Sequence, residues 1–255
     1  MPRVIKHAAL VRARCSLTFR CERMGAGASA SSKALSAAVS ADDAAAVRTT
    51  EAPPRELGKA LHLAAAKGSL AALKALLQRK EVDVNFEASK VTAMRAAIGA
   101  HQVAAVTILL ADARITLSAT IAKPFRRIAA HERSAERAAP LHFAQKMAKE
   151  KADTCYREGV PLLVAAAIAA NHRSASYKEG AEAACADIIR ALLADSRVTV
   201  DHEIGLAALA WCAPNASCVE ALLAARERTG VDQAAVDVAV ADDNRMSMSA
   251  QSWGM

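Results

Sequence analysis

The clearest hydrophobic pattern in the chain lies between residues 59 and 85. Its first part, 60–65, is short, apolar and rich in alanine, which favours a helix with close neighbours. Gly68 interrupts this run, and an extended stretch, 82–85, ends the unit. Between them four leucines share one helical face: Leu70, Leu73, Leu76 and Leu77. The pattern predicts a helix, a tight turn, a second helix and an extended finger, and neither helix is long enough to be stable alone.

The same pattern returns 33 residues further along. Thr92 takes the place of Lys59 and opens a second apolar run, 92–98. The pair Leu109–Leu110 falls where Leu76–Leu77 fell, and an extended stretch again follows the pair. Recurrence at a fixed period is the sequence signature of a stacked repeat array.

These units resemble the ankyrin repeat family, whose pattern is Thr-Pro-Leu-His-x-Ala-Ala, a Gly-His turn, a Val-Val pair and a Leu-Leu pair. The first-helix runs that carry the resemblance are 59–65, 92–98 and 139–144. No single copy matches the whole pattern, but several copies occur in phase. The resemblance implies an all-α fold, an ankyrin-repeat solenoid of stacked antiparallel helix pairs with short β-hairpin fingers.

The period divides the chain into a tail, an array and a second tail. Residues 1–32 are expected to be a disordered basic tail with a Gly/Ala/Ser linker, 33–244 the array, and 245–255 a polar tail. Degenerate caps are expected at both ends of the array, because the ends of a solenoid need a polar outer face. The expected units are a capping pair at 33–52, repeats near 57–89, 90–118, 158–201 and 203–230, and a half-repeat cap at 231–244.

Two segments depart from the period. Residues 119–157 contain a first-helix motif at 139–144 without its leucine pair. They are either an irregular insertion with one or two helices, which we favour, or a half-eroded repeat. In the next repeat Leu192–Leu193 follow Val160 by 32 residues rather than 17. We place the extra residues, near 171–183, in the turn between the two helices, where they disturb stacking least.

Positive charge is concentrated at the N-terminus. The chain carries a formal net charge of +7, from 33 Lys and Arg against 26 Asp and Glu. Residues 1–24 account for +5 of this and the other 231 residues for +2. Only 3% of residues are aromatic, so few side chains could stack on bases and we expect no specific nucleic-acid partner. We also expect no transmembrane segment, because no apolar run approaches the ~20 residues that span a bilayer.

The first 24 residues allow three interpretations. They are a disordered basic tail, an organelle transit peptide, or a segment that is not translated because synthesis starts at Met24. In the last case Gly25 would be the lipidation site of an N-myristoylation pattern, and a single acyl chain would give weak peripheral membrane contact. A cytoplasmic location is the leading expectation, with organelle targeting or membrane association as the alternatives.

The chain shows no catalytic constellation in a suitable context. The six cysteines form no CxxC pair and have no matching histidine cluster, so we interpret them as small buried hydrophobes. No G-x-S-x-G, HExxH or phosphate-binding loop is recognisable. His62, His101 and His142 occupy motif or turn positions and are interpreted as structural. We therefore expect no catalytic residue, no metal, no cofactor and no enzymatic activity.

Binding is the function that a repeat array favours. Stacked repeats form a concave surface from finger tips and first-helix faces, and basic side chains on it would steer an acidic partner segment. The candidate contact residues are Lys67, Arg79, Lys80, Arg95, Arg114 and Arg197. The leading prediction is a non-enzymatic protein–protein interaction scaffold or adaptor. The alternative is a regulatory or substrate-recruiting subunit of an enzyme complex.

Overall fold

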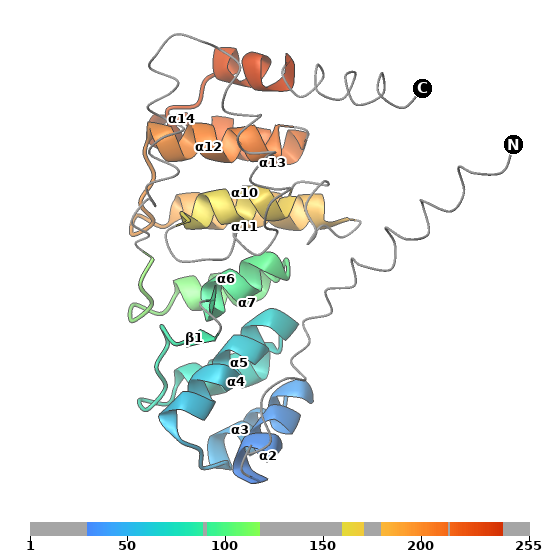
Figure 1. Cartoon of the computed structure of the whole chain (residues 1–255), viewed down its shortest axis with the longest axis vertical. Coiled ribbons are helices and arrows are strands. Elements are labelled where there is room, and N and C mark those ends of the chain that lie inside the picture. Colours follow the sequence, from blue (N-terminus) through green and yellow to red (C-terminus); the bar gives the residue numbers. More distant parts are fainter. Residues whose placement is uncertain (1–29, 89–90, 118–159, 171–179, 214, 242–255) are drawn as a thin grey trace, which may run out of the picture.

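The computed structural model of the chain describes residues 30–88, 91–117, 160–170, 180–213 and 215–241. Over these residues the protein is mostly helical, which confirms the predicted all-α class. Figure 1 shows the helices arranged one pair above another along the long axis of the molecule. Gly25, the segment 119–157 and most of the residues near 171–183 lie outside the described residues.

The described helices follow one another as pairs. The pairs are α2 (Ala30–Ser40) with α3 (Ala44–Thr49), α4 (Pro54–Lys67) with α5 (Leu70–Leu77), α6 (Ala93–Gly99) with α7 (Val103–Leu110), α10 (Leu162–Ala170) with α11 (Ala181–Ala194), and α12 (His202–Cys212) with α13 (Ala216–Ala224). A short helix, α14 (Arg226–Thr229), follows α13, and residues 233–241 are also helical. Strands β1 (Glu87–Ala88) and β2 (Val91–Thr92) form a small antiparallel hairpin in which Glu87 pairs with Thr92.

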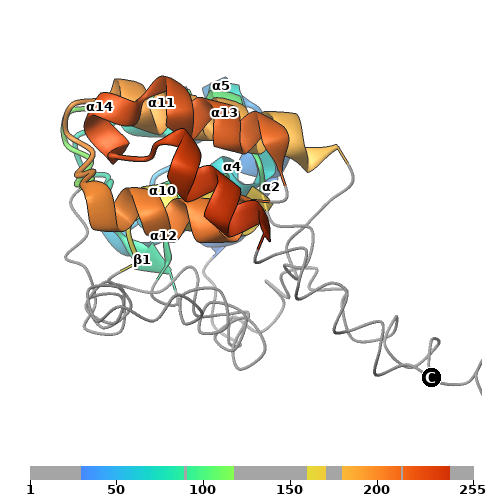
Figure 2. The same cartoon turned by 90° about the horizontal axis from the view of Figure 1, so that it is seen from above.

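The main contacts between helices join neighbouring pairs. The first helices contact one another in the order α2, α4, α6, α10 and α12, and the second helices in the order α3, α5, α7, α11 and α13. Figure 2, which looks along the stack, shows α5, α11 and α13 on one side and α10 and α12 on the other. Because α6 packs on α10 and α7 on α11, the pairs before and after 118–159 are direct neighbours.

Close packing of small residues holds these layers together. Alanines such as Ala64, Ala97 and Ala208 are fully buried beside leucines of the second helices, for example Leu76 and Leu109. Helix α10 is buried along its whole length. A helix that is apolar on every face is expected in the interior of a protein, so α10 lies at the centre of the stack.

The turns that follow α4 and α6 each use a left-handed residue. Gly68 has φ +72° and His101 has φ +59°, and these two residues lie 33 positions apart, which is the period seen in the sequence. Glycine adopts this conformation without steric cost, whereas a histidine is strained in it. The turn that we predicted at Gly68 is therefore present, and the next turn has the same geometry without a glycine.

Three helix boundaries differ from the expectations. Helix α4 begins at Pro54 rather than near residue 59, because proline is well suited to the first turn of a helix. Helix α2 begins at Ala30, inside the predicted disordered linker, and the Ser32 hydroxyl donates to Glu56 Oε2 at 2.8 Å, which ties this turn to α4. Residues 181–183, which we placed in the inter-helix insertion, form the first turn of α11.

Candidate functional site

Four arginines that follow second helices reach back to the preceding helix pair. We call Arg79, Arg114, Arg197 and Arg228 the arginine ladder. Each donates from its guanidinium to backbone carbonyls at the C-terminal end of the preceding second helix. The last four carbonyls of a helix have no partner within it and carry partial negative charge, which a guanidinium with five N–H donors satisfies.

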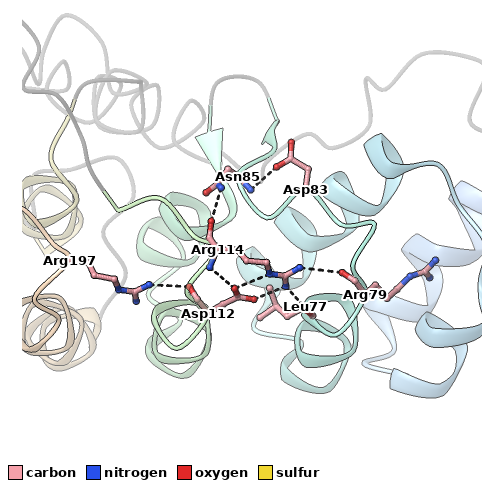
Figure 3. A network of polar contacts seen from close by, with 7 residues as sticks. All are labelled: Leu77, Arg79, Asp83, Asn85, Asp112, Arg114 and Arg197. Carbon is pink, nitrogen blue, oxygen red and sulfur yellow. Dashed lines mark hydrogen bonds and ion pairs between the residues drawn. The ribbon is translucent and has the colours of Figure 1, made fainter.

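Each arginine of the ladder contacts the end of the second helix in the preceding pair, and Figure 3 shows this for Arg114 and Arg197. Arg79 Nη1 donates to Thr50 O at 2.7 Å and to Val47 O at 3.1 Å, at the end of α3. Arg114 Nη2 donates to Leu77 O at 2.5 Å, at the end of α5. The guanidinium of Arg197 reaches Leu110 O and, at 3.2 Å, Asp112 O, at the end of α7.

The last contact belongs to Arg228. Its Nη1 donates to Leu193 O, at the end of α11. Its Nη2 donates to Val198 O at 3.0 Å and to Asp195 O at 3.2 Å. The ladder therefore continues from α3 to α14.

An aspartate two residues earlier orients two of these arginines. Asp112 accepts hydrogen bonds from Arg114 at the backbone N, at Nε and at Nη2, with a shortest distance of 2.7 Å. Asp195 does the same for Arg197, also with a shortest distance of 2.7 Å. The arginine side chain lowers the pKa of each carboxyl through these hydrogen bonds, and Asp112 and Asp195 in turn raise the pKa of their arginines.

The fingers are joined by a second kind of contact, which uses Asn85. Its Nδ2 donates to Arg114 O at 2.9 Å, and its Oδ1 accepts from Thr116 N at 2.8 Å. Figure 3 shows Asn85 between the two fingers, above the Asp112–Arg114 pair. One amide side chain thus bridges the finger of the α4–α5 pair to that of the α6–α7 pair.

The six predicted contact residues do not form one patch. Arg79, Arg114 and Arg197 lie along the ladder, and Lys80 is exposed beside Arg79. Lys67 lies at the other end of the helix pair, where its Nζ donates to Ser40 Oγ at 2.8 Å. The 14 residues of α4 separate the two ends by about 21 Å.

The sixth predicted residue, Arg95, is inside the protein. Arg95 is only 7% exposed, and its Nη2 donates to Val160 O, just before α10. Its Nη1 has no hydrogen-bond partner among the described residues. Burial lowers the pKa of Arg95, and the charge of Glu87 opposes this shift. The prediction that these six residues contact a partner stays a prediction, and Arg95 does not lie on an open surface.

His62 occupies the equivalent position one repeat before Arg95. It is 9% exposed, and burial lowers its pKa below the ordinary value of 6.5, so the imidazole is neutral at pH 7. The same motif position therefore holds a neutral buried ring in one repeat and a buried guanidinium in the next. A neutral, buried ring suits the structural interpretation of His62.

The described thiols are buried, as we predicted. Cys185, Cys212 and Cys218 are free and fully buried, and burial raises the pKa of Cys185 and of Cys218 to about 12. His101 Nδ1 lies 3.1 Å from Cys185 Sγ, which resembles a nucleophile–base pair. However, a catalytic thiol needs a lowered pKa and access to substrate, and Cys185 has neither. Within the described ranges no three His, Cys, Asp or Glu side chains lie close enough together to hold a metal ion.

The described residues carry a small negative net charge. The described residues contain 14 Lys and Arg against 17 Asp and Glu, a net charge of −3, although the whole chain carries +7. The positive excess therefore belongs to the parts of the sequence outside the described ranges. None of the helices in the described ranges is both long enough and apolar enough to span a membrane.

Three residues of the ladder contacts were not among the predicted site residues. The aspartates Asp112 and Asp195 were missed although Leu-Leu-Ala-Asp-x-Arg occurs twice, at 109–114 and 192–197, and Arg228 was missed because it lies outside this motif. Comparison with known proteins adds no assignment: no family model matches the chain, and neither the curated proteins nor the solved structures yield a match.

Proposed function

We propose that this chain is a non-enzymatic protein–protein interaction scaffold, built as an ankyrin-type solenoid. The observation that carries the proposal is the stacking order, in which each described helix pair packs on the next described pair along the chain. Such a stack presents a long, repetitive surface rather than a single enclosed site. The polar side chains of the ladder join successive pairs instead of converging on one point.

The finger edge is the surface that we assign to a partner. The β1–β2 hairpin and the turns that follow α5, α7 and α11 all lie along this edge of the stack (Figure 1). Lys80 is exposed there and has no hydrogen bond or ion pair within the described residues, so its ammonium group is free for a partner carboxylate. A charge of this kind changes the association rate and its salt dependence more than the final affinity.

Capture of partners by the full chain, with identification by mass spectrometry, is the first test. The association rate of the captured protein is then measured with wild type, Lys80→Glu and the control Lys74→Glu. Lys74 is also an exposed lysine, but it lies on α5 itself, away from the fingers. We expect Lys80→Glu to slow association roughly tenfold at low salt, with a smaller effect at high salt, and Lys74→Glu to leave the association rate unchanged, since an exposed charge acts mainly by steering the encounter.

Two results would count against this proposal. Equal association rates for wild type and both variants would remove the finger edge from the interface. If a captured enzyme changed its turnover when the chain was added, the function would instead be that of a regulatory or substrate-recruiting subunit. Reversal of Arg79, Arg114 or Arg197 to glutamate is a poor test, because it would also remove the caps on the preceding helices.

A further inference from the structure

One junction in the stack differs from the others. It lies between the α6–α7 pair and the α10–α11 pair, where α7 ends at Leu110 and α10 begins only at Leu162. In the first-helix layer the α6–α10 interface is less extensive than the α4–α6 and α10–α12 interfaces and similar to α2–α4, whereas in the second-helix layer the α7–α11 interface is more extensive than α5–α7. Figure 1 also shows that the helices change direction gradually along the stack, because α4 and α5 are more inclined to α10 and α11 than α6 and α7 are.

Polar contacts span this junction at three separate places. At the finger edge, Arg197 donates to Leu110 O and Asp112 O. In the first-helix layer, Arg95 donates to Val160 O. At the turn end, His101 Nδ1 lies 3.1 Å from Cys185 Sγ. The first-helix layer, where the α6–α10 interface is small, therefore has an additional polar contact from the buried guanidinium of Arg95.

Chain connectivity favours separation at this junction. The residues joined by Arg197 lie 85 to 87 positions apart, whereas Arg114 joins residues 35 to 37 positions apart at the preceding junction. The chain entropy lost when two segments meet grows with the length between them. In a solenoid, stability is approximately a sum of repeat terms and nearest-neighbour terms, so the weakest interface decides whether the array responds as one unit.

We propose that the junction between α6–α7 and α10–α11 is a latched hinge. Arg197, Arg95 and the His101–Cys185 contact are its latches. The latches hold two blocks, residues 30–117 and 160–241, in one stack, and loss of a latch lets the blocks unfold or tilt separately. The inference does not depend on the identity of any partner.

Urea unfolding with two probes tests the hinge. The chain has two tryptophans, Trp211 and Trp253. In a Trp253→Phe background, fluorescence reports Trp211, which is 8% exposed on α12, while far-UV circular dichroism reports helices of both blocks. We expect the two curves to coincide in this background and their midpoints to separate by at least ~0.5 M urea in Arg197→Met.

Arg114→Met is the matched control. Arg114 has the same aspartate partner geometry and the same kind of carbonyl contact as Arg197, but it spans the α4–α5/α6–α7 junction. We expect it to lower a single shared midpoint. Coincident curves in Arg197→Met would overturn the hinge, and so would separate curves in the background protein, because the latches would then not couple the blocks.

A milder variant covers the case in which Arg197→Met does not fold. Arg197→Lys keeps the positive charge beside Asp195 but loses the planar fork that reaches two carbonyls. Hydrogen–deuterium exchange of this variant should accelerate in α6, α7, α10 and α11 and remain unchanged in α4 and α5. Uniform acceleration, or none, would contradict the proposal.

Discussion

The turn at Gly68 allows the clearest test of the repeat geometry. Gly68 ends α4 in the left-handed conformation, with φ +72° and ψ +28°, and its N–H donates to Ala64 O. A Cβ atom at this position would lie 2.2 Å from Gln102 Oε1, which comes from the turn of the next repeat. Gly68→Ala therefore introduces two separate penalties, one from backbone conformation and one from the contact between neighbouring turns.

The two penalties have different sizes and different controls. An L-residue in the left-handed region costs about 1 kcal/mol relative to glycine. Displacement of the Gln102 side chain, whose Nε2 donates to Ala100 O at 3.3 Å, adds about 1 kcal/mol as a mild overpacking cost. We therefore expect Gly68→Ala to lower the free energy of unfolding by ~2 kcal/mol, which corresponds to a fall in Tm of roughly 4–8 °C.

Gly180 provides a control for backbone strain alone. It has φ +77°, and no atom of the described residues lies within 4 Å of the position of its Cβ. Gly180→Ala should therefore cost only about 1 kcal/mol. The double variant Gly68→Ala/Gln102→Ala should recover most of the difference between the two, because it removes the close contact but keeps the strained conformation.

Urea and thermal unfolding, followed by circular dichroism at 222 nm, give the required free energies. The reasoning fails if Gly68→Ala and Gly180→Ala destabilise equally, since the inter-turn contact would then contribute nothing. It also fails if Gln102→Ala does not relieve the cost of Gly68→Ala. A neutral Gly68→Ala would mean that the turn does not have left-handed geometry.

Three further expectations follow from the ladder, the fingers and the thiols. The pKa values of Asp112 and Asp195 are lowered from 3.8 in the folded state, so the stabilisation by these carboxylates is present above pH 3.8 and is lost as pH falls through the folded pKa. The difference in free energy of unfolding between wild type and Asp112→Asn, measured with urea, should therefore be constant above about pH 5 and shrink in acid. A difference that does not depend on pH would contradict this. Asn85→Ala should cost ~1 kcal/mol because two hydrogen bonds between fingers are lost, and an unchanged urea midpoint would contradict it. The three described thiols should react with a maleimide at pH 7 only as fast as the array opens, so peptide mapping by mass spectrometry that shows rapid labelling of Cys185, Cys212 or Cys218 in the folded protein would contradict their burial.

In the part of the chain that the structure describes, the finger edge has few cations that are free to contact an acidic partner. With −3 on the described residues, and with Arg79, Arg114 and Arg197 bonded to carbonyls, the finger edge offers fewer free cations than the sequence suggested. Lys80 remains available on that edge. Basic residues in the undescribed ranges account for the positive net charge of the chain.

Local sequence was sufficient to predict the helix pairs. Leucines at helical spacing, from Leu70 to Leu77, define the buried face of a second helix whatever it packs against, because side chains three and four positions apart share one side of a helix. Gly68 predicted its turn, because few other residues adopt a positive φ easily. His101 has the same turn geometry, and its place 33 residues after Gly68 is what indicated a turn there, because the residue itself is not a glycine.

The roles of the arginines depended on tertiary structure. The 33-residue period places Glu81, not Arg79, at the position equivalent to Arg114, yet Arg79 makes the corresponding contact with the preceding pair. Whether a long, flexible side chain faces solvent or a neighbouring helix end is decided by where that helix ends in space, which is a non-local property. For the same reason the side chain of Arg95, which we predicted on a binding surface, instead extends from α6 to the residue just before α10 and is buried there. Periodicity thus predicted the described helix pairs, and their stacking determined which charged side chains of the described ranges remain exposed.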